Sequence, residues 1–169
     1  KLMAERGISV LHCPTSNLKL GSGIAPVPSL MAAGVNVTLG TDGASSNNDL
    51  DLFNEIKLTA MLHKGANLDA TILPTAEVLK MATANGAKDL AGVLAAGWDA
   101  DLIALDFDRP HLKPCHDVME NLVYSVKSSD VVLNMTGGKI LYRDGFFSTL
   151  DLDRINHGLE QALPTLFGT

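Results

Sequence analysis

The stretch NVTLGTDGASSNNDLD, residues 36–51, decides which fold the sequence predicts. An apolar run over residues 37–39 ends at Gly40, and a polar loop that is rich in helix-capping residues follows. This pattern predicts a buried strand that delivers Asp42 to a loop, and the loop then opens a helix. In barrel and open-sheet α/β proteins the chemistry lies at the carboxyl ends of strands, so Asp42 is the first candidate functional residue.

The residues that precede this stretch predict a strand–helix–strand unit. Residues 8–12 form a short β-branched and apolar run, and the polar residues 13–23 that follow read as a loop. A short helix is expected over residues 26–33, and the next strand over residues 35–39. A βαβ unit implies a parallel sheet, which places the chain in the α/β class.

Two longer helices are expected after the loop. Apolar residues recur at helical spacing over residues 50–64, with Glu55 among the polar positions between them, and Gly65 is expected to end the helix. The second helix begins near Pro74 and stops near Gly86, with a weaker helical piece over residues 87–90.

The later part of the chain is richer in strand signals. Residues 101–107 read as a strand, and residues 131–143 read as a β-hairpin that turns at two glycines. A last short strand is expected at residues 146–147, whereas residues 118–126 fit a helix or a strand equally well. The predicted division is a βα segment over residues 1–91, a β-rich segment over 92–150 and a terminal helix within 151–169.

Composition excludes several classes of protein. The chain has 169 residues, a formal net charge of −6 and no basic stripe, which argues against a nucleic-acid or anionic-membrane surface. No apolar run approaches the roughly 20 residues of a membrane-spanning helix. The two cysteines, Cys13 and Cys115, lie far apart and favour a reducing, cytoplasmic compartment. Residues 1–7 look like the end of a helix closed by Gly7, which indicates the C-terminal part of a longer protein, or else a trimmed terminus.

Asp42 can bind a divalent metal, act as a general base or cap the following helix. The capping role is weakened because residues 45–49 supply better-placed caps. A calcium loop is excluded, since Asn47 stands at the sixth position, where that motif needs Gly.

The five histidines form no H-x-H or H-E-x-x-H pair. For His12, at the end of a predicted strand, a buried structural role with a bond to a backbone carbonyl is favoured over a role in the site. His63 lies near the end of a helix, where a cation suits the dipole. We expect the other three at the surface: His111, His116 and His157.

The loop after the first strand offers further candidates. Cys13 has no identifiable base beside it, so an ordinary buried thiol is favoured over a nucleophile. Ser16 and Asn17 can either bind a substrate or stabilise the turn through local bonds to the backbone, and the sequence does not decide between these roles.

Four motifs occur in order: HCPTSNLKLGSG at residues 12–23, LGTDGASSNNDLD at 39–51, MATANGA at 81–87 and ADLIAL at 100–105. Together they resemble the C-terminal part of the amidohydrolase superfamily. The branch that is most similar contains the 5-methylthioadenosine/S-adenosylhomocysteine deaminases and their chlorohydrolase relatives. One departure is the run at residues 92–100, GVLAAGWDA, which lacks the Glu and Lys usual at the entry to that family's second domain.

The resemblance implies a distorted (β/α)8 (TIM) barrel that carries a composite β-sandwich. Residues 8–12 and 35–41 would be the seventh and eighth barrel strands, and residues from 92 onward would belong to the sandwich. The family holds one divalent metal, usually Zn²⁺ with Fe²⁺ possible, through an H-x-H, a later His and the Asp of strand eight. Asp42 matches that Asp, so the resemblance makes it a metal ligand, a catalytic proton acceptor and a substrate-binding residue.

The other metal ligands and the proton-shuttling Glu of the family do not occur in this sequence. The resemblance therefore implies a deaminase of a purine-type ring, such as S-adenosylhomocysteine or 5-methylthioadenosine, which needs the N-terminal part of its own chain as a partner. We expect this fragment alone to be inactive, and a homo-oligomer is possible. The alternatives are a substrate such as guanine, cytosine or a chlorotriazine, or a non-catalytic binding or assembly module.

Overall fold

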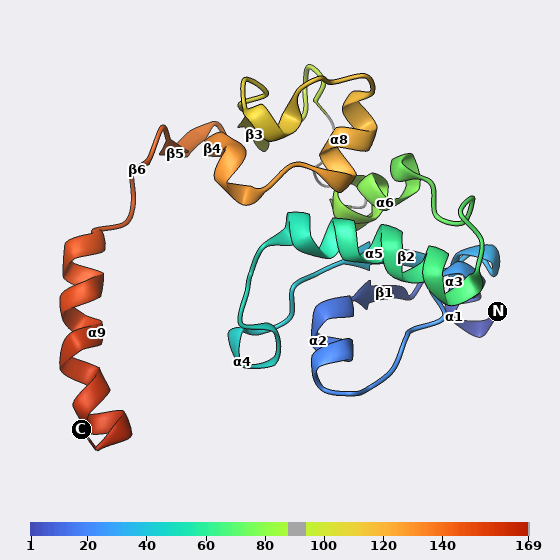
Figure 1. Ribbon diagram of the computed structural model, residues 1–169, viewed down its shortest axis with the longest axis horizontal. Helices are drawn as coiled ribbons and strands as arrows, with labels where there is room; N and C mark the ends of the chain where they lie inside the picture. Colours follow the sequence, from blue (N-terminus) through green and yellow to red (C-terminus); the bar gives the residue numbers. More distant parts are fainter. Residues whose placement is uncertain (88–93, 169) are drawn as a thin grey trace.

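A computed structural model describes residues 1–87 and 94–168 (Figure 1). The predicted boundary near residue 92 and the helical piece over residues 88–90 lie outside the described residues. The first part contains two strands and seven helices: α1 (Leu2–Glu5), β1 (Ser9–His12), α2 (Pro14–Lys19), α3 (Val27–Ala32), β2 (Asn36–Leu39), α4 (Ala44–Asn47), α5 (Leu52–Asn67), α6 (Thr75–Ala82) and α7 (Ala84–Ala87).

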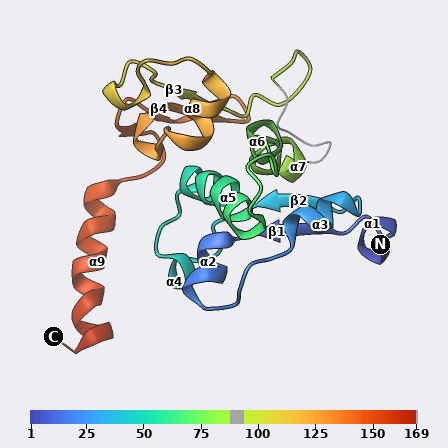
Figure 2. The ribbon, with the colours of Figure 1, turned by 45° about the vertical axis from the view of Figure 1, so that its right-hand side comes forward.

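The two strands of this part lie parallel, with Ser9 opposite Asn36 and His12 opposite Leu39. This confirms the predicted parallel unit, with α2 and α3 in the connection between its strands. Figure 2 shows β1 and β2 side by side, with α5 alongside them. Both strands therefore end at the same edge of the sheet. Helix α2 follows β1 there, and α4 follows β2.

Three predicted details of the helices are wrong. Residues 14–17 are not a loop but the start of α2, because Pro14 stands in its first turn, where a missing N–H costs nothing. Gly65 does not end α5, which continues to Asn67 and ends at the left-handed Leu68. The N-cap of α5 is Asp51, which accepts a hydrogen bond from the backbone N–H of Phe53, rather than a residue of 45–49.

Helix α6 ends at Ala82, earlier than expected, and α7 follows as a separate short helix. The ambiguous segment 118–126 is helical over Val118–Tyr124, where Asp117 caps the helix by accepting from the backbone N–H groups of Met119 and Glu120. The later part of the chain contains β3 (Leu102–Leu105), η1 (Pro110–Leu112), α8 (Val118–Tyr124), η2 (Ser128–Asp130), β4 (Val131–Thr136), β5 (Lys139–Arg143), β6 (Phe146–Phe147) and α9 (Leu152–Phe167).

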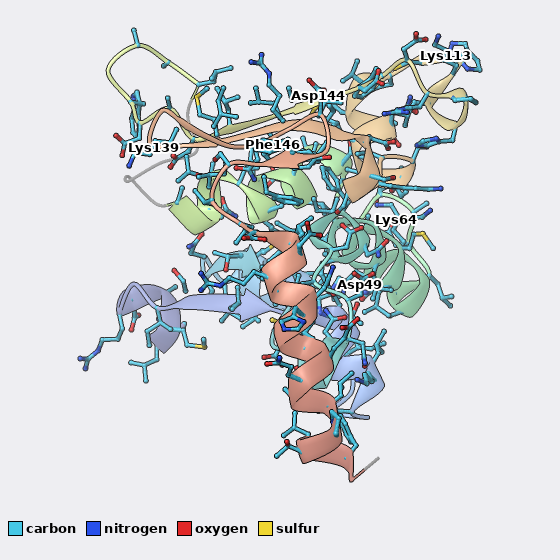
Figure 3. All side chains as sticks on the ribbon, turned by 90° about the vertical axis from the view of Figure 1, so that its left-hand side faces the viewer. Asp49, Lys64, Lys113, Lys139, Asp144 and Phe146 are labelled. Carbon is cyan, nitrogen blue, oxygen red and sulfur yellow. The ribbon has the colours of Figure 1, made fainter. Side chains whose placement is uncertain are left out.

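These four strands form an antiparallel sheet in the order β3-β4-β5-β6. The predicted hairpin is confirmed, and its turn residues Gly137 and Gly138 both have the positive φ angles that such a turn requires. In Figure 3 this sheet carries the labelled Lys139 and Phe146, with Asp144 in the turn between β5 and β6. Helix α9 projects away from the rest of the chain in Figures 1 and 2.

The core joins β2 to the helices α3, α5, α6 and α8. Val37 of β2 and Met81 of α6 are both almost completely buried in it. The other members of this cluster are Val27, Leu39, Ile56, Ala60, Leu73, Val78 and Val123. In residues 1–87 and 94–168, no helix is both long enough and apolar enough to cross a membrane.

Candidate functional site

The candidate site lies where β1 and β2 end together. The backbone N–H of Gly40 donates to the carbonyl of His12 over 3.0 Å, which extends the parallel pairing by one residue. Helix α2 directly follows β1, and a loop leads from β2 to α4. The residues that follow both strands are thereby brought to one edge, as the sequence predicted for Asp42.

Asp42 is held by two hydroxyl groups. Its Oδ2 accepts a hydrogen bond of 2.7 Å from Ser16 Oγ on α2 and another of 2.7 Å from Ser46 Oγ on α4. The bonds from Ser16 and Ser46, together with one from the backbone of Gly43, hold the pKa of the exposed carboxyl below its usual value. Asp42 is therefore an oriented, ionised carboxylate at neutral pH.

The backbone of Asp42 also has a special conformation. Its φ is +60°, in the left-handed region that Asp and Asn tolerate better than most residues. Ser16, whose role the sequence left undecided, is buried and donates to Asp42 rather than to its own turn. Asn17 lies half-buried within α2.

Asp42 suits a divalent metal as one ligand of a larger set. A catalytic zinc usually takes three protein ligands and a water molecule. Residues 1–87 and 94–168 contain no group of three or more His, Cys, Asp or Glu side chains placed to hold a metal ion. The described residues thus offer the chemistry of a single oriented carboxylate, and a metal ion bound to it would need ligands from outside them.

The structure pairs two histidines that the sequence analysis treated separately. His12 Nε2 lies 3.3 Å from His63 Nε2 of α5, and both side chains are buried. The structural role expected for His12 thus involves His63, and not the backbone carbonyl that we predicted. His63 is not an exposed cation at a helix end. Burial and then the proximity of His63 lower the pKa of His12 to about 4, and burial lowers the pKa of His63.

This pair predicts a loss of stability in mild acid. In the folded state His12 stays neutral down to a pH of about 4, whereas in the unfolded chain it takes up a proton near its usual pKa of 6.5. The unfolded state therefore binds more protons between these values, and the free energy of unfolding falls as the pH drops from 6.5 to 4. The part of this decrease in the free energy of unfolding that is due to His12 is about 3 kcal/mol at most.

Urea denaturation of the metal-free protein at several pH values measures this slope. The variant His12→Gln lacks the titrating group and is expected to lose much of the slope. An equal slope in both proteins would contradict the role of the buried pair.

The other predicted candidates have simpler surroundings. Burial and the nearby charges of Asp42 and Glu55 raise the pKa of Cys13, which disfavours the thiolate and supports its role as an unreactive thiol. His111 is exposed as expected, although its ring lies 2.9 Å from the buried carboxylate of Asp130. The remaining two histidines are also exposed as predicted, His116 and His157.

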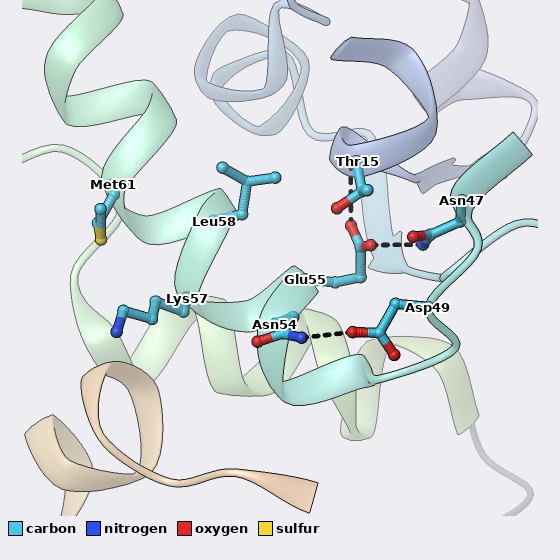
Figure 4. Close-up of a pocket in the computed structure, with 8 residues that line it drawn as sticks. All are labelled: Thr15, Asn47, Asp49, Asn54, Glu55, Lys57, Leu58 and Met61. Atoms are coloured by element: carbon cyan, nitrogen blue, oxygen red, sulfur yellow. Dashed lines mark hydrogen bonds between the residues drawn. The ribbon is translucent and has the colours of Figure 1, made fainter. Parts of the chain in front are cut away.

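Sequence reasoning missed Glu55, which it placed on the polar face of α5. Glu55 is only 1% exposed, and its carboxylate accepts from the backbone N–H of Thr15 over 3.2 Å and from Asn47 Nδ2 over 2.8 Å (Figure 4). A polar residue in the first turn of an amphipathic helix is normally solvated, so helical spacing alone could not identify it.

An open pocket lies beside Glu55. Figure 4 shows the eight residues that line it: Thr15, Asn47, Asp49, Asn54, Glu55, Lys57, Leu58 and Met61. Asp42 is not among them, so the pocket lies next to the site rather than at the candidate metal ligand.

Comparison with known proteins finds a matching family, similar sequences and a similar solved structure. Residues 1–141 match the amidohydrolase family. The chain is 50% identical over 159 residues to a 5-methylthioadenosine/S-adenosylhomocysteine deaminase of Moorella thermoacetica. This match covers 91% of this chain and 37% of the relative. It is 47% identical over 169 residues to a 5'-deoxyadenosine deaminase of Methanosarcina mazei. This match covers 98% of this chain and 39% of the relative.

A solved structure is similar over the same length. The crystal structure of a zinc-bound adenosine deaminase from Xanthomonas campestris matches with a TM-score of 0.94 and 37% identity, over 99% of this chain and 39% of that one. The chain thus spans less than two fifths of the length of each of these three proteins.

Proposed function

Because the chain belongs to the amidohydrolase family, we propose that it supplies the last part of a metal-dependent deaminase that acts on a purine nucleoside. The observation that carries this proposal is Asp42, an oriented and ionised carboxylate at the ends of two parallel strands. The names of the relatives support a deaminase, and they point to substrates such as S-adenosylhomocysteine, 5-methylthioadenosine and 5'-deoxyadenosine.

In this proposal β1 and β2 are the last two strands of a (β/α)8 barrel, and residues 1–91 belong to it. Residues 92–150 contribute to a composite β-sandwich, for which the antiparallel order β3-β4-β5-β6 is suitable, and residues 151–169 add the terminal helix. The free thiols of Cys13 and Cys115 suit a cytoplasmic enzyme.

Asp42 would hold a divalent cation, for which Zn²⁺ is the first candidate because zinc is bound in the adenosine deaminase from Xanthomonas campestris. Such an ion, when bound, lowers the pKa of a water molecule so that hydroxide is available near neutral pH. The Asp42 carboxylate would accept a proton from that water and would pass it on during loss of ammonia. The hydrogen bonds from Ser16 and Ser46 would keep the carboxylate in one orientation for this role.

The remaining ligands would come from the part of the relatives' length that residues 1–169 do not cover. We call the protein formed by that part and residues 1–169 the complete enzyme. The competing interpretation is a binding or assembly module in which Asp42 is only structural.

Ammonia release from a panel of nucleosides tests the proposal. The complete enzyme, loaded with zinc, is expected to deaminate at least one of S-adenosylhomocysteine, 5-methylthioadenosine, 5'-deoxyadenosine and adenosine. The isolated residues 1–169, assayed in parallel, are expected to show neither turnover nor stoichiometric zinc, since one carboxylate cannot hold the ion alone. Zinc binding and turnover by the isolated chain, or no turnover of any nucleoside by the complete enzyme, would refute the proposal.

A further inference from the structure

Glu55 lies at the centre of the contacts that surround Asp42 without touching it. Its side chain is almost completely buried at the start of α5, although the sequence placed it on the polar face of that helix. One carboxylate oxygen accepts from Thr15 N and the other from Asn47 Nδ2 (Figure 4). Helices α2, α4 and α5 therefore meet at this one carboxylate.

Each partner of Glu55 is the sequence neighbour of a group that fixes Asp42. Thr15 precedes Ser16, and Asn47 follows Ser46, and these two serines donate to Asp42 Oδ2. Asn47 Nδ2 also donates to the carbonyl of Thr41 over 2.7 Å, so it holds the residue directly before Asp42.

We propose that Glu55 is a positioning residue that sets the orientation of the Asp42 carboxylate through Ser16 and Ser46. This inference rests on the proposed function, because it assigns Glu55 to the same metal-dependent site. It adds a residue that bonds to Thr15 and Asn47 rather than to Asp42, and that would act through these two neighbours of the serines.

The chemistry of the contacts requires a carboxylate at this position. Both partners of Glu55 are N–H donors, and the amide of Asn47 must turn its nitrogen toward two acceptors, Glu55 and Thr41. A carboxylate has two acceptor oxygens, one for Thr15 N and one for Asn47 Nδ2. The amide of Gln has only one acceptor oxygen, and its nitrogen is a donor. The bond from Asn47 is buried and the bond from Thr15 is partly buried, so a donor that Gln leaves unpaired costs free energy.

The variant Glu55→Gln in the complete enzyme tests the proposal. We expect its zinc dissociation constant, measured by competition with a chelator, to rise about 10- to 100-fold, as is typical when a group that orients a metal ligand is lost. We expect kcat to fall by a larger factor than KM rises, because Glu55 would act on the orientation of the proton-accepting carboxylate. The matched control is Glu77→Gln on α6, which removes an exposed ion pair with Lys80 and should alter neither quantity.

A coupling measurement separates positioning from general destabilisation. If Glu55 acts through the serines, adding Glu55→Gln to the double variant Ser16→Ala/Ser46→Ala should weaken zinc binding much less than it does in the wild type. Equal effects of Glu55→Gln in both backgrounds, or a lower melting temperature with unchanged zinc binding, would overturn the proposal.

A crystal structure of the metal-free Glu55→Gln variant distinguishes a failure of this inference from a failure of the proposed function. The inference predicts a longer or broken contact between Ser16 Oγ and Asp42 Oδ2, and an unchanged 2.7 Å contact would refute it. This result does not depend on zinc. Tight zinc binding that survives Asp42→Asn would refute the proposed function instead.

Discussion

Replacing Asp42 by Asn in the complete enzyme is expected to lower kcat/KM by about 10⁴-fold or more, with little loss of folded protein. The amide cannot accept a proton as a carboxylate does, and general-base catalysis alone contributes about 10²- to 10⁴-fold. Weaker metal binding adds to this loss, because an amide oxygen is a poorer zinc ligand than a carboxylate. Steady-state deamination rates at saturating zinc measure the effect.

The local backbone makes Asn the informative substitution at this position. Asp42 has a φ of +60°, which Asn adopts as readily as Asp, so the variant removes the charge without straining the loop. The matched control is Asp49→Asn in the same loop, where an exposed carboxylate accepts only from Asn54 Nδ2. Retained activity in Asp42→Asn, or an equal loss in Asp49→Asn, would contradict the role assigned to Asp42.

The second large effect concerns stability. Met81→Ala is expected to lower the free energy of unfolding by about 2–5 kcal/mol, because Met81 is completely buried and its removal leaves a cavity in the core. This core supports β2, which carries Asp42 at its end. Chemical denaturation monitored by circular dichroism measures the change.

A neighbouring residue on the same helix provides the control. Lys80→Ala removes an exposed ion pair with Glu77 and should change the free energy of unfolding by less than about 1 kcal/mol. Below its melting temperature, Met81→Ala should retain most of the activity per folded molecule, in contrast to Asp42→Asn. A stable Met81→Ala protein would show that the cluster around β2 does not support the fold.

The sequence was sufficient to predict the elements that depend on local patterns. The alternating and apolar runs predicted β1 and β2, and the Gly137–Gly138 turn predicted the hairpin of β4 and β5. Helix ends were less predictable, since Gly65 is tolerated inside α5 while Leu68 takes the left-handed conformation that ends it. Tertiary packing, and not local propensity, decides such positions.

The site could be predicted only in part. Asp42 was identifiable because its strand, its loop and a resemblance to a family all point to the same residue. Glu55 and the pair of His12 and His63 could not be identified, because Thr15 is 40 residues from Glu55 and His63 is 51 residues from His12 in the sequence. A polar residue on a helix looks the same in sequence whether it faces solvent or a buried donor.

The most direct test of the central claim is the position of the metal in the complete enzyme. Anomalous diffraction at the zinc edge is expected to show one peak with an Asp42 carboxylate oxygen about 2.0–2.2 Å away, and Asp42→Asn is expected to weaken or abolish it. A zinc peak remote from Asp42, or one unchanged by Asp42→Asn, would contradict the assignment of Asp42 as a metal ligand.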